Sequence, residues 1–283
     1  MRFLPLLWAL VLSGCSAVSV INALVPEGGF ERTAGVAYGE DTRQRLDVYV
    51  PRVETTASAP VVVFFYGGRW QEGERASYLF VAQALVAQGF VVVVPDYRVY
   101  PAVQYPGFIE DGARAVAWTQ REIGRFGGDP ARIFLMGHSA GAHIAAMLAY
   151  DEAFLAREGL RRSDVRGVIG LAGPYDFLPL TEADLFGVFS AASSLEATQP
   201  IRYVRGGEPA SLLITGDADT TVKPGNTVRL AARLREKGST VVERHYGSLD
   251  HYTLMARLAA PLRDHALLAT IAAFVRGEPL APR

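Results

Sequence analysis

Short apolar segments alternate along the chain with segments whose apolar residues follow a helical spacing. The apolar segments are four or five residues long, as expected for strands covered on both faces, and lie at Val61–Phe65, Phe90–Val94, Ile133–Met136, Val168–Ala172 and Leu212–Thr215. Among the helical segments, Tyr78–Gln88 ends at Gly89 and Asn226–Lys237 ends at Gly238. This alternation predicts an α/β fold in which a mostly parallel sheet is flanked by helices.

Other segments extend this pattern toward both ends. Leu46–Val50 alternates apolar and polar residues, which is typical of an edge strand. A helix with one apolar face is expected over Ile109–Gln120, and a helix that is apolar nearly all round over Ala140–Tyr150. We expect the chain to finish with a strand at Thr240–Tyr246 and a helix interrupted at Pro261.

One long segment departs from the alternation. Pro174–Glu208 contains three phenylalanines and no regular strand pattern. Open sheets of this class bind ligands at the carboxyl ends of their strands. We therefore expect residues 174–208 to form a small cap over that edge, inserted in a single domain that covers residues 34–283.

The first fifteen residues have the layout of a secretory signal. One cation, Arg2, precedes the apolar run Phe3–Leu12, which is too short to span a membrane, and small residues follow. The ending Leu12-Ser13-Gly14-Cys15 resembles the lipobox of bacterial lipoproteins, in which the cysteine is lipidated and becomes the mature N-terminus.

This resemblance to lipoproteins implies a location in the bacterial cell envelope. Residues 1–14 would be the signal peptide, and Cys15 would carry acyl chains such as palmitate and anchor a tether that extends through residue 33. Ser16, directly after the cysteine, fits the pattern that permits export to the outer membrane, where the domain would face the periplasm.

Composition excludes several classes of protein. The chain has 28 Lys and Arg against 29 Asp and Glu, so no basic surplus exists to bind a nucleic acid. Its single cysteine excludes an intrachain disulfide framework and a cysteine-ligated metal cluster. The histidines lack H-x-x-x-H or H-E-x-x-H spacing, and no G-x-G-x-x-G opens the first helix. We therefore expect no metal, cofactor or nucleic-acid partner.

A nucleophile motif lies between a predicted strand and a predicted helix. Gly137-His138-Ser139-Ala140-Gly141 has the form G-x-S-x-G, with the apolar run Ile133–Met136 before it and a helix from Ala140 after it. A serine on such a sharp turn has strained backbone angles, and its neighbours two residues away must lack side chains. The helix N-terminus behind the serine favours developing negative charge, so the context predicts that Ser139 is a catalytic nucleophile.

Here the chain resembles the α/β-hydrolase superfamily. It is similar to the carboxylesterase group close to arylformamidases and to xylan or feruloyl esterases, over residues 47–274. The resemblance is carried by Tyr66-Gly67-Gly68-Arg69-Trp70, Asp96-Tyr97-Arg98, Gly137-His138-Ser139-Ala140-Gly141-Ala142-His143, Gly216-Asp217-Ala218-Asp219-Thr220-Thr221-Val222 and Asp250-His251. It implies the α/β-hydrolase fold and a serine esterase activity.

Five histidines compete for the role of general base, which a serine nucleophile requires. In this fold the catalytic residues follow the chain order serine, acid, histidine. His138 and His143 flank the serine on the same turn and helix and could not easily reach back over it. His245 lies in a predicted strand and His265 in the last predicted helix. His251 follows a strand and a loop, so it is the predicted base.

The acid is expected directly after the strand Leu212–Thr215. Asp219 stands three residues before Val222, which matches the D-x-x-V pattern of the family that the chain resembles. Asp217 is better interpreted as a turn residue. The resemblance therefore favours Asp219 as the acid, with Asp217 and Asp250 as alternatives.

The resemblance also implies an oxyanion hole built from backbone N–H groups. One would come from Ala140, after the nucleophile, and one or two from the loop Gly67, Gly68 and Arg69, where glycine lets the main chain approach the substrate. The family usually begins this loop with histidine, and this chain has Tyr66. A phenol could brace the loop by a hydrogen bond as the histidine is thought to do.

These features predict a serine hydrolase that cleaves carboxylic esters of small to moderate size through an acyl-enzyme. Two alternatives remain open: an amidase or formamidase with the same three residues, and an inactive hydrolase-fold lipoprotein that only interacts with partners. The expected partners are a small ester or amide substrate and, through Cys15, a membrane. The sequence leaves the acyl group, the leaving group and the oligomeric state open.

Overall fold

The computed structural model describes residues 21–26, 28–52 and 58–280, and in them the strands form one sheet. Its eight strands are β1 (Phe30–Ala37), β2 (Arg45–Pro51), β3 (Ala59–Phe65), β4 (Val91–Pro95), β5 (Gly128–His138), β6 (Gly167–Leu171), β7 (Ala210–Gly216) and β8 (Val241–Tyr246). Their order in the sheet is β1-β2-β4-β3-β5-β6-β7-β8. The pairs β1–β2 and β2–β4 are antiparallel, and the other five pairs are parallel. The predicted mostly parallel sheet is therefore confirmed.

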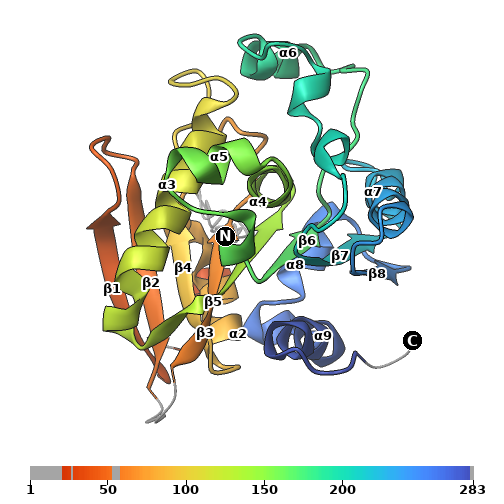
Figure 1. Cartoon of the computed structure of the whole chain (residues 1–283). Coiled ribbons are helices and arrows are strands. Elements are labelled where there is room, and N and C mark those ends of the chain that lie inside the picture. Colours follow the sequence, from red (N-terminus) through yellow and green to blue (C-terminus); the bar gives the residue numbers. More distant parts are fainter. Residues whose placement is uncertain (1–20, 27, 53–57, 281–283) are drawn as a thin grey trace, which may run out of the picture.

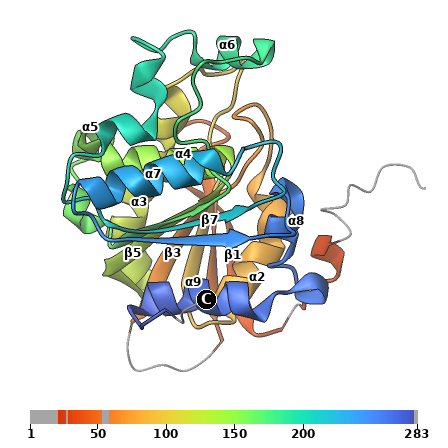
Figure 2. The ribbon, with the colours of Figure 1, turned by 90° about the vertical axis from the view of Figure 1, so that its right-hand side faces the viewer.

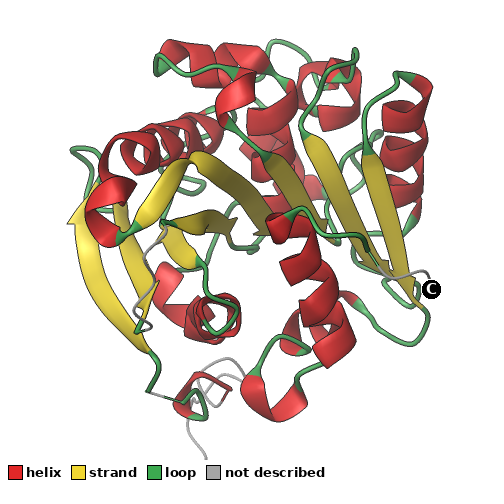
Figure 3. Cartoon of the chain, turned by 60° about the horizontal axis from the view of Figure 1, so that its bottom comes forward, coloured by secondary structure: helices red, strands yellow, loops and turns green. Residues whose placement is uncertain are grey.

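Helices cover both faces of this sheet. Those of the described residues are α2 (Leu79–Val86), α3 (Gly107–Glu122), α4 (Ala140–Tyr150), α5 (Glu152–Arg157), α6 (Ala183–Phe189), α7 (Gly225–Glu236), α8 (His251–Ala256) and α9 (His265–Arg276). In Figures 1 and 2, α3, α4 and α7 lie on one face, and α2 and α9 on the other. Figure 3 shows the twisted sheet between these layers. The buried apolar residues form one continuous core, with β3 to β7 at its centre.

The expectation that residues 46–50 form an edge strand is wrong, because β2 lies between β1 and β4. The alternation that suggested an edge strand comes from Asp47, which is fully buried. Its carboxylate accepts hydrogen bonds from Arg32 and Arg75 at 2.6 and 2.8 Å and from the backbone N–H of Gly35 at 2.8 Å. A buried charge with these partners resembles an exposed polar position in the sequence pattern.

The edge strand on this side of the sheet is β1, and it begins at Phe30, inside residues 15–33, which the sequence predicts to be a tether. The described residues before β1 also pack on the domain. The side-chain amide of Asn22 donates to the carbonyl of Ala76 at 3.1 Å, and its carbonyl oxygen accepts from the N–H of Phe80 at 3.2 Å. The expected signal peptide and Cys15 lie outside the described residues. None of the helices in the described part of the chain has the length and apolar character needed to cross a membrane.

The expected cap segment, residues 174–208, contains α6 and short 3₁₀ turns but no strand. In Figure 2, α6 stands beyond the helix layer that contains α4 and α7. The cap is joined to the body of the domain by the backbone N–H of Tyr105, which donates to the carbonyl of Val188 at 2.9 Å.

The parallel strands bring the loops with the candidate chemistry to one edge of the sheet. The Tyr66 loop follows β3, Ser139 follows β5, Asp219 follows β7, and His251 follows β8. Because all four strands are parallel, their carboxyl ends face the same side. The topology therefore gathers residues that are far apart in the sequence.

Candidate active site

Ser139 lies on the turn between β5 and α4. Its φ of 54° and ψ of −123° are rarely adopted by a residue other than glycine, and its N–H donates to the carbonyl of Leu171 at 2.9 Å. A Cβ on Gly137 would collide with the carbonyl of Gly141, and a Cβ on Gly141 would collide with the carbonyl of Phe65. Both glycines of the G-x-S-x-G motif are therefore required for α4 to start this close to β3 and β5.

His251 and Asp219 form a buried pair at the same edge. The Nδ1 atom of His251, the first residue of α8, lies 2.8 Å from Oδ2 of Asp219. The other carboxylate oxygen, Oδ1, accepts the backbone N–H groups of Thr221 and Val222 at 2.9 and 2.8 Å. This arrangement explains the D-x-x-V spacing, because the loop backbone fixes the carboxylate. It leaves Oδ2 to accept a proton from Nδ1, which in the neutral imidazole makes Nε2 of His251 the nitrogen without a proton.

The first alternative acid, Asp217, contacts a different histidine. Its Oδ1 atom lies 2.6 Å from Nδ1 of His245, whose Nε2 lies 3.0 Å from Glu243. Burial by itself lowers the pKa of His245, but the two carboxylates outweigh it and raise this pKa overall. The three side chains therefore form a separate cluster on β8 and the loop after β7.

The second alternative acid, Asp250, has a structural position. It is exposed, and its side chain accepts the backbone N–H groups of Tyr252 and Thr253 at 3.0 and 2.7 Å as the N-cap of α8. Among the three candidate acids, the geometry places Asp219 against His251. Asp250 instead fixes the point at which the helix carrying His251 begins.

The two histidines that flank the nucleophile are engaged elsewhere. Nε2 of His138 donates to the carbonyl of His251 at 3.0 Å, and burial together with the nearby His251 lowers the pKa of His138 to about 3. Nε2 of His143 donates to the carbonyl of Thr198 at 2.8 Å, and burial lowers the pKa of His143 to about 4. His138 therefore supports the start of α8, with its ring 4.7 Å from that of His251, and His143 joins α4 to the cap.

The loop after β3 approaches the nucleophile closely. A Cβ on Gly67 would lie 3.1 Å from Cβ of Ser139 and 3.2 Å from Nδ1 of His138. The backbone N–H of Gly67 interacts with the hydroxyl of Tyr78 and opposes the burial that raises the pKa of that tyrosine to about 12. Glycine at position 67 therefore allows the loop backbone to pass directly beside Ser139.

The next three residues turn the backbone sharply. Gly68, Arg69 and Trp70 have φ angles of 124°, 55° and 60°, all in the left-handed region. The carbonyl of Gly68 accepts the N–H groups of Gln71 and Glu72 at 2.9 and 3.0 Å, which closes the turn. Two non-glycine residues in this conformation indicate a loop held by its surroundings.

Tyr66, the departure from the family pattern, braces this loop indirectly. Its hydroxyl donates to Oδ1 of Asp96 at 2.8 Å and accepts from Arg43 at 3.0 Å. The same Arg43 nitrogen donates to the carbonyl of Gly73 at 2.7 Å, at the far end of the loop. Burial raises the pKa of Tyr66 well above its ordinary value, so its hydroxyl remains a donor. A phenol with an arginine partner thus supports the loop, as expected.

The cap holds the same loop through its charged side chains. Arg69 donates to Glu182 at 2.5 Å and to Asp184 at 2.7 Å, and Gln71 also donates to Asp184 at 2.9 Å. We call Arg69, Glu182 and Asp184 the loop–cap clamp. Neither carboxylate is predicted from the sequence, since no motif connects residues more than a hundred positions apart.

Aromatic side chains pack together between the loop and the cap. Trp70 is buried, with its ring centroid 6.2 Å from Phe108, 6.0 Å from Phe177 and 4.9 Å from Phe189. Two of these phenylalanines belong to the cap. Trp70 is therefore the centre of a packed aromatic cluster beside the candidate site. No group of three or more His, Cys, Asp or Glu side chains in the described residues is placed to hold a metal ion.

The chain has the α/β-hydrolase fold. Two solved structures match most of it: a truncated carbohydrate esterase from gut microbiota has a TM-score of 0.78 at 19% identity and covers 89% of this chain and 98% of its own. Esterase B from Lactobacillus rhamnosis has a TM-score of 0.78 at 22% identity and covers 92% and 89%. At these identities the likeness establishes the fold alone.

The family follows from the sequence. The BD-FAE family model matches residues 46–234, and the chain belongs to this family. The match begins in β2 and ends in α7, so it includes Ser139 and Asp219 but stops before His251.

Individual relatives are enzymes of more than one kind. Esterase LipC of Mycobacterium tuberculosis is 34% identical over 71% of this chain and 54% of its own length. A probable isoprenylcysteine alpha-carbonyl methylesterase, ICMEL1 of Oryza sativa subsp. japonica, is 29% identical over 81% of this chain and 58% of its own length. Kynurenine formamidase of Salmo salar is 32% identical over 63% and 60%. The chain spans between about a third and three fifths of the length of such curated relatives.

Proposed function

We propose that this protein is a serine hydrolase that cleaves carboxylic esters through an acyl-enzyme, with Ser139 as nucleophile, His251 as base and Asp219 as the orienting acid. The observation that carries the proposal is the 2.8 Å pair of His251 and Asp219 at the sheet edge where Ser139 stands on its strained turn. The esterase relatives support the same reaction class.

The proton transfers follow from the hydrogen bonds of His251. Its Nδ1–H is held by Asp219, so Nε2 takes the Ser139 hydroxyl proton as Oγ attacks the ester carbonyl carbon. The imidazolium then gives this proton to the departing alcohol, which leaves an acyl group on Oγ. Water, deprotonated by the same Nε2, hydrolyses the acyl-enzyme and returns the serine. The buried Asp219 carboxylate stabilises the imidazolium at both stages.

The negative oxygen of each tetrahedral intermediate needs N–H donors. Ala140 is the first residue of α4, so its N–H has no partner within the helix and faces outward with the positive end of the helix dipole. The N–H of Gly67 interacts with Tyr78, so Gly68 and Arg69 are the loop residues that we assign as further donors. Each such donor contributes roughly 2.7–4 kcal/mol to lowering the barrier.

The aromatic side chains between the loop and the cap indicate which esters the site accepts. Trp70 and Phe189 are buried and Phe177 is half-buried, and their rings pack together between the loop and the cap. We therefore propose substrates with small or moderately sized apolar groups on the side that faces the cap.

The direct test is hydrolysis of p-nitrophenyl acetate and butyrate by the purified protein without residues 1–14. Ser139→Ala should abolish turnover, and Ser248→Ala, at an exposed serine in the loop before His251, should leave it unchanged. A fluorophosphonate probe should label the parent and Ser248→Ala but not Ser139→Ala. Unchanged turnover in Ser139→Ala would contradict the assignment.

A second candidate reaction is formamide hydrolysis by the same residues, which the kynurenine formamidase relative favours. The two reactions differ in the leaving atom, since His251 would have to protonate a nitrogen instead of an oxygen. Parallel measurements of kcat/KM on N-formylkynurenine and on p-nitrophenyl butyrate distinguish them.

We also propose that the protein is a lipoprotein of the bacterial cell envelope, anchored through Cys15 to the outer membrane. The support is the Leu12-Ser13-Gly14-Cys15 motif after an apolar run, with Ser16 next. Cells that express the protein should incorporate labelled palmitate into it and retain it in the membrane fraction. Cys15→Ser should eliminate both results, and Ser16→Ala should not.

A further inference from the structure

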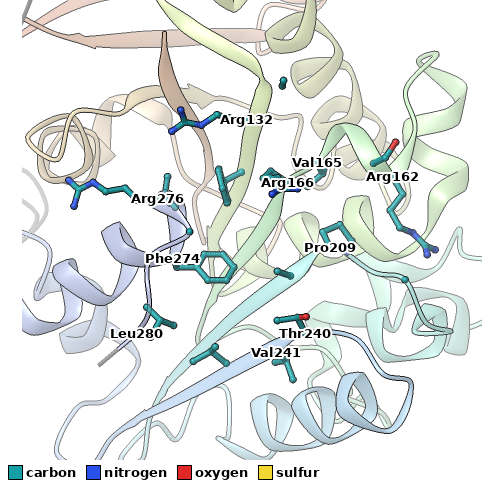
Figure 4. Close-up of a pocket in the computed structure, with 18 of the residues that line it drawn as sticks. Arg132, Arg162, Val165, Arg166, Pro209, Thr240, Val241, Phe274, Arg276 and Leu280 are labelled. Carbon is teal, nitrogen blue, oxygen red and sulfur yellow. The ribbon is translucent and has the colours of Figure 1, made fainter. Parts of the chain in front are cut away.

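A large groove lies at the opposite edge of the sheet from Ser139. It is bounded by the starts of β5, β6, β7 and β8, by the segment before β6 and by the end of α9, and has a volume of about 1550 Å³. Figure 4 shows its side chains, with the Phe274 ring in the middle. We call this hollow the amino-edge groove. Nothing in the proposed reaction uses it, because the catalytic residues follow the carboxyl ends of the same strands.

The charge of the groove is strongly positive. Seven arginines and three glutamates line it, although the whole chain has a net charge of −1. Two of the glutamates are already paired, Glu152 with Arg162 at 2.7 Å and Glu243 with Arg235 at 2.9 Å. The side chains of Arg132 and Arg166 form no ion pair or hydrogen bond with any described residue. The groove therefore presents guanidinium groups that the rest of the described chain does not neutralise.

Apolar side chains lie among these arginines. Phe134 and Phe274 pack edge to face with their ring centroids 6.1 Å apart. Val165 and Val241 also line the groove, and Figure 4 shows Phe274 below Arg132 and Val165 between Arg132 and Arg162. A ligand that matches this surface combines a negative head with a hydrocarbon part.

We propose that the amino-edge groove binds a free long-chain carboxylate, with its head at Arg132 and Arg166 and its chain on the Phe134–Phe274 surface. The volume of about 1550 Å³ leaves room for an extended chain. A symmetric pairing of two grooves is disfavoured, because two such positive faces would repel each other. A flat bilayer does not fit, because the binding surface is concave.

The test uses the mature chain with Cys15→Ser, which needs no detergent, and titrates it with laurate by calorimetry. Laurate should bind with a stoichiometry of one, and butyrate at least tenfold more weakly, since each buried methylene contributes up to about fourfold in affinity. Dodecyltrimethylammonium, with the same chain and a positive head, should not bind. Arg132→Glu/Arg166→Glu should weaken laurate binding at least tenfold, and p-nitrophenyl acetate hydrolysis should stay within twofold.

The matched control is Arg52→Glu/Arg125→Glu, which makes the same charge change at two exposed arginines outside the groove and should bind laurate as the parent does. A laurate analogue with a diazirine should crosslink to residues 131–134 and 274–280. Unaltered binding by the groove variant, equal binding of the cation, or crosslinks at residues 137–143 or 247–252 would each overturn the proposal. So would sedimentation with phosphatidylglycerol vesicles in place of laurate binding, which would indicate a membrane surface.

Discussion

Two aspartates two positions apart face two different histidines. Asp219 is 4% exposed, with one carboxylate oxygen tied to the loop backbone and the other on His251. Asp217 is exposed and lies on His245. The backbone between them turns the side chains in different directions, so only one of them reaches the candidate base.

This difference predicts opposite outcomes for the same chemical change. Asp219→Asn should lower kcat for p-nitrophenyl acetate by about 10⁴-fold, because an amide cannot hold His251 in the required tautomer. The kcat of Asp217→Asn should stay within about threefold of that of the parent. Equal losses in the two variants would show that the loop as a whole, and not one carboxylate, supports the reaction.

His245 makes stability depend on pH. Burial lowers its pKa, but Glu243 and Asp217 raise it above the ordinary value of 6.5. A raised folded-state pKa adds stability that is fully present below about pH 6.5 and is lost as the pH rises through the folded-state value. His245→Gln should therefore reduce Tm more at pH 5.5 than at pH 9. The control is His265→Gln, at an exposed histidine, whose effect on Tm should not differ between these pH values. A reduction that is constant with pH would contradict this role.

At the scale of elements, the cap and the loop after β3 act on one another. The loop–cap clamp joins Arg69, whose φ is 55°, to the carboxylates on and just before α6. All three side chains are 40% exposed or more, so each pair contributes about 0.2–1 kcal/mol. This small contribution acts on the residue whose N–H we assign to the oxyanion hole.

We therefore expect Glu182→Gln/Asp184→Asn to lower kcat about two- to fivefold at low ionic strength, with KM for p-nitrophenyl acetate unchanged. The difference from the parent should disappear at 1 M salt, where the parent's exposed pairs are screened as well. Glu236→Gln, which removes a comparable pair on α7, is the control. A parental kcat in the double variant would show that the cap does not position the loop.

The elements that the sequence predicts are those with continuous local patterns. The apolar runs became β3 to β7, and the helices around them lie within a few residues of their expected bounds. β1 has no such pattern, because Phe30–Ala37 is a largely exposed edge strand with a register shift after Thr33. Asp47 led to the wrong prediction of an edge strand at residues 46–50, because the arginines that pair with it lie outside the local sequence.

The same distinction separates the parts of the candidate site. The G-x-S-x-G turn and the D-x-x-V loop are determined by neighbouring residues, so Ser139 and Asp219 can be identified from spacing. The supports of the loop after β3 come from Arg43 and from the two cap carboxylates of the clamp, which are distant in sequence. Their roles depend on tertiary contacts that no short motif records.

Across the whole molecule, charged side chains connect the outermost strand to the candidate site. Arg32 on β1 and Arg75 both bind Asp47 on β2, and Arg75 continues to Asp96, which accepts from Tyr66. Tyr66 begins the loop beside Ser139. The antiparallel strands β1 and β2 therefore support the loop as well as extending the sheet.

Asp47 is the centre of this network, and its loss should reduce the stability of the entire domain. Burial raises its pKa, but hydrogen bonds from Arg75, Gly35 and Arg32 outweigh it and lower the pKa below 3.8. Removing one member of such a buried group costs about 2–3 kcal/mol here, less than for a fully buried pair because Arg32 and Arg75 are partly exposed. Asp47→Asn should lower the free energy of unfolding in urea by this amount at pH 7.

The pH dependence of this loss follows from the lowered pKa. The stabilisation by Asp47 is present above about pH 3.8 and is lost as the pH falls through the folded-state value, because the carboxyl group then takes up a proton. The difference between the parent and Asp47→Asn should be constant from pH 7 to pH 5 and shrink between pH 4 and pH 3. Glu40→Gln, at an exposed carboxylate, should show no such difference. A gap as large at pH 3 as at pH 7 would assign the loss to packing and not to the charge of Asp47.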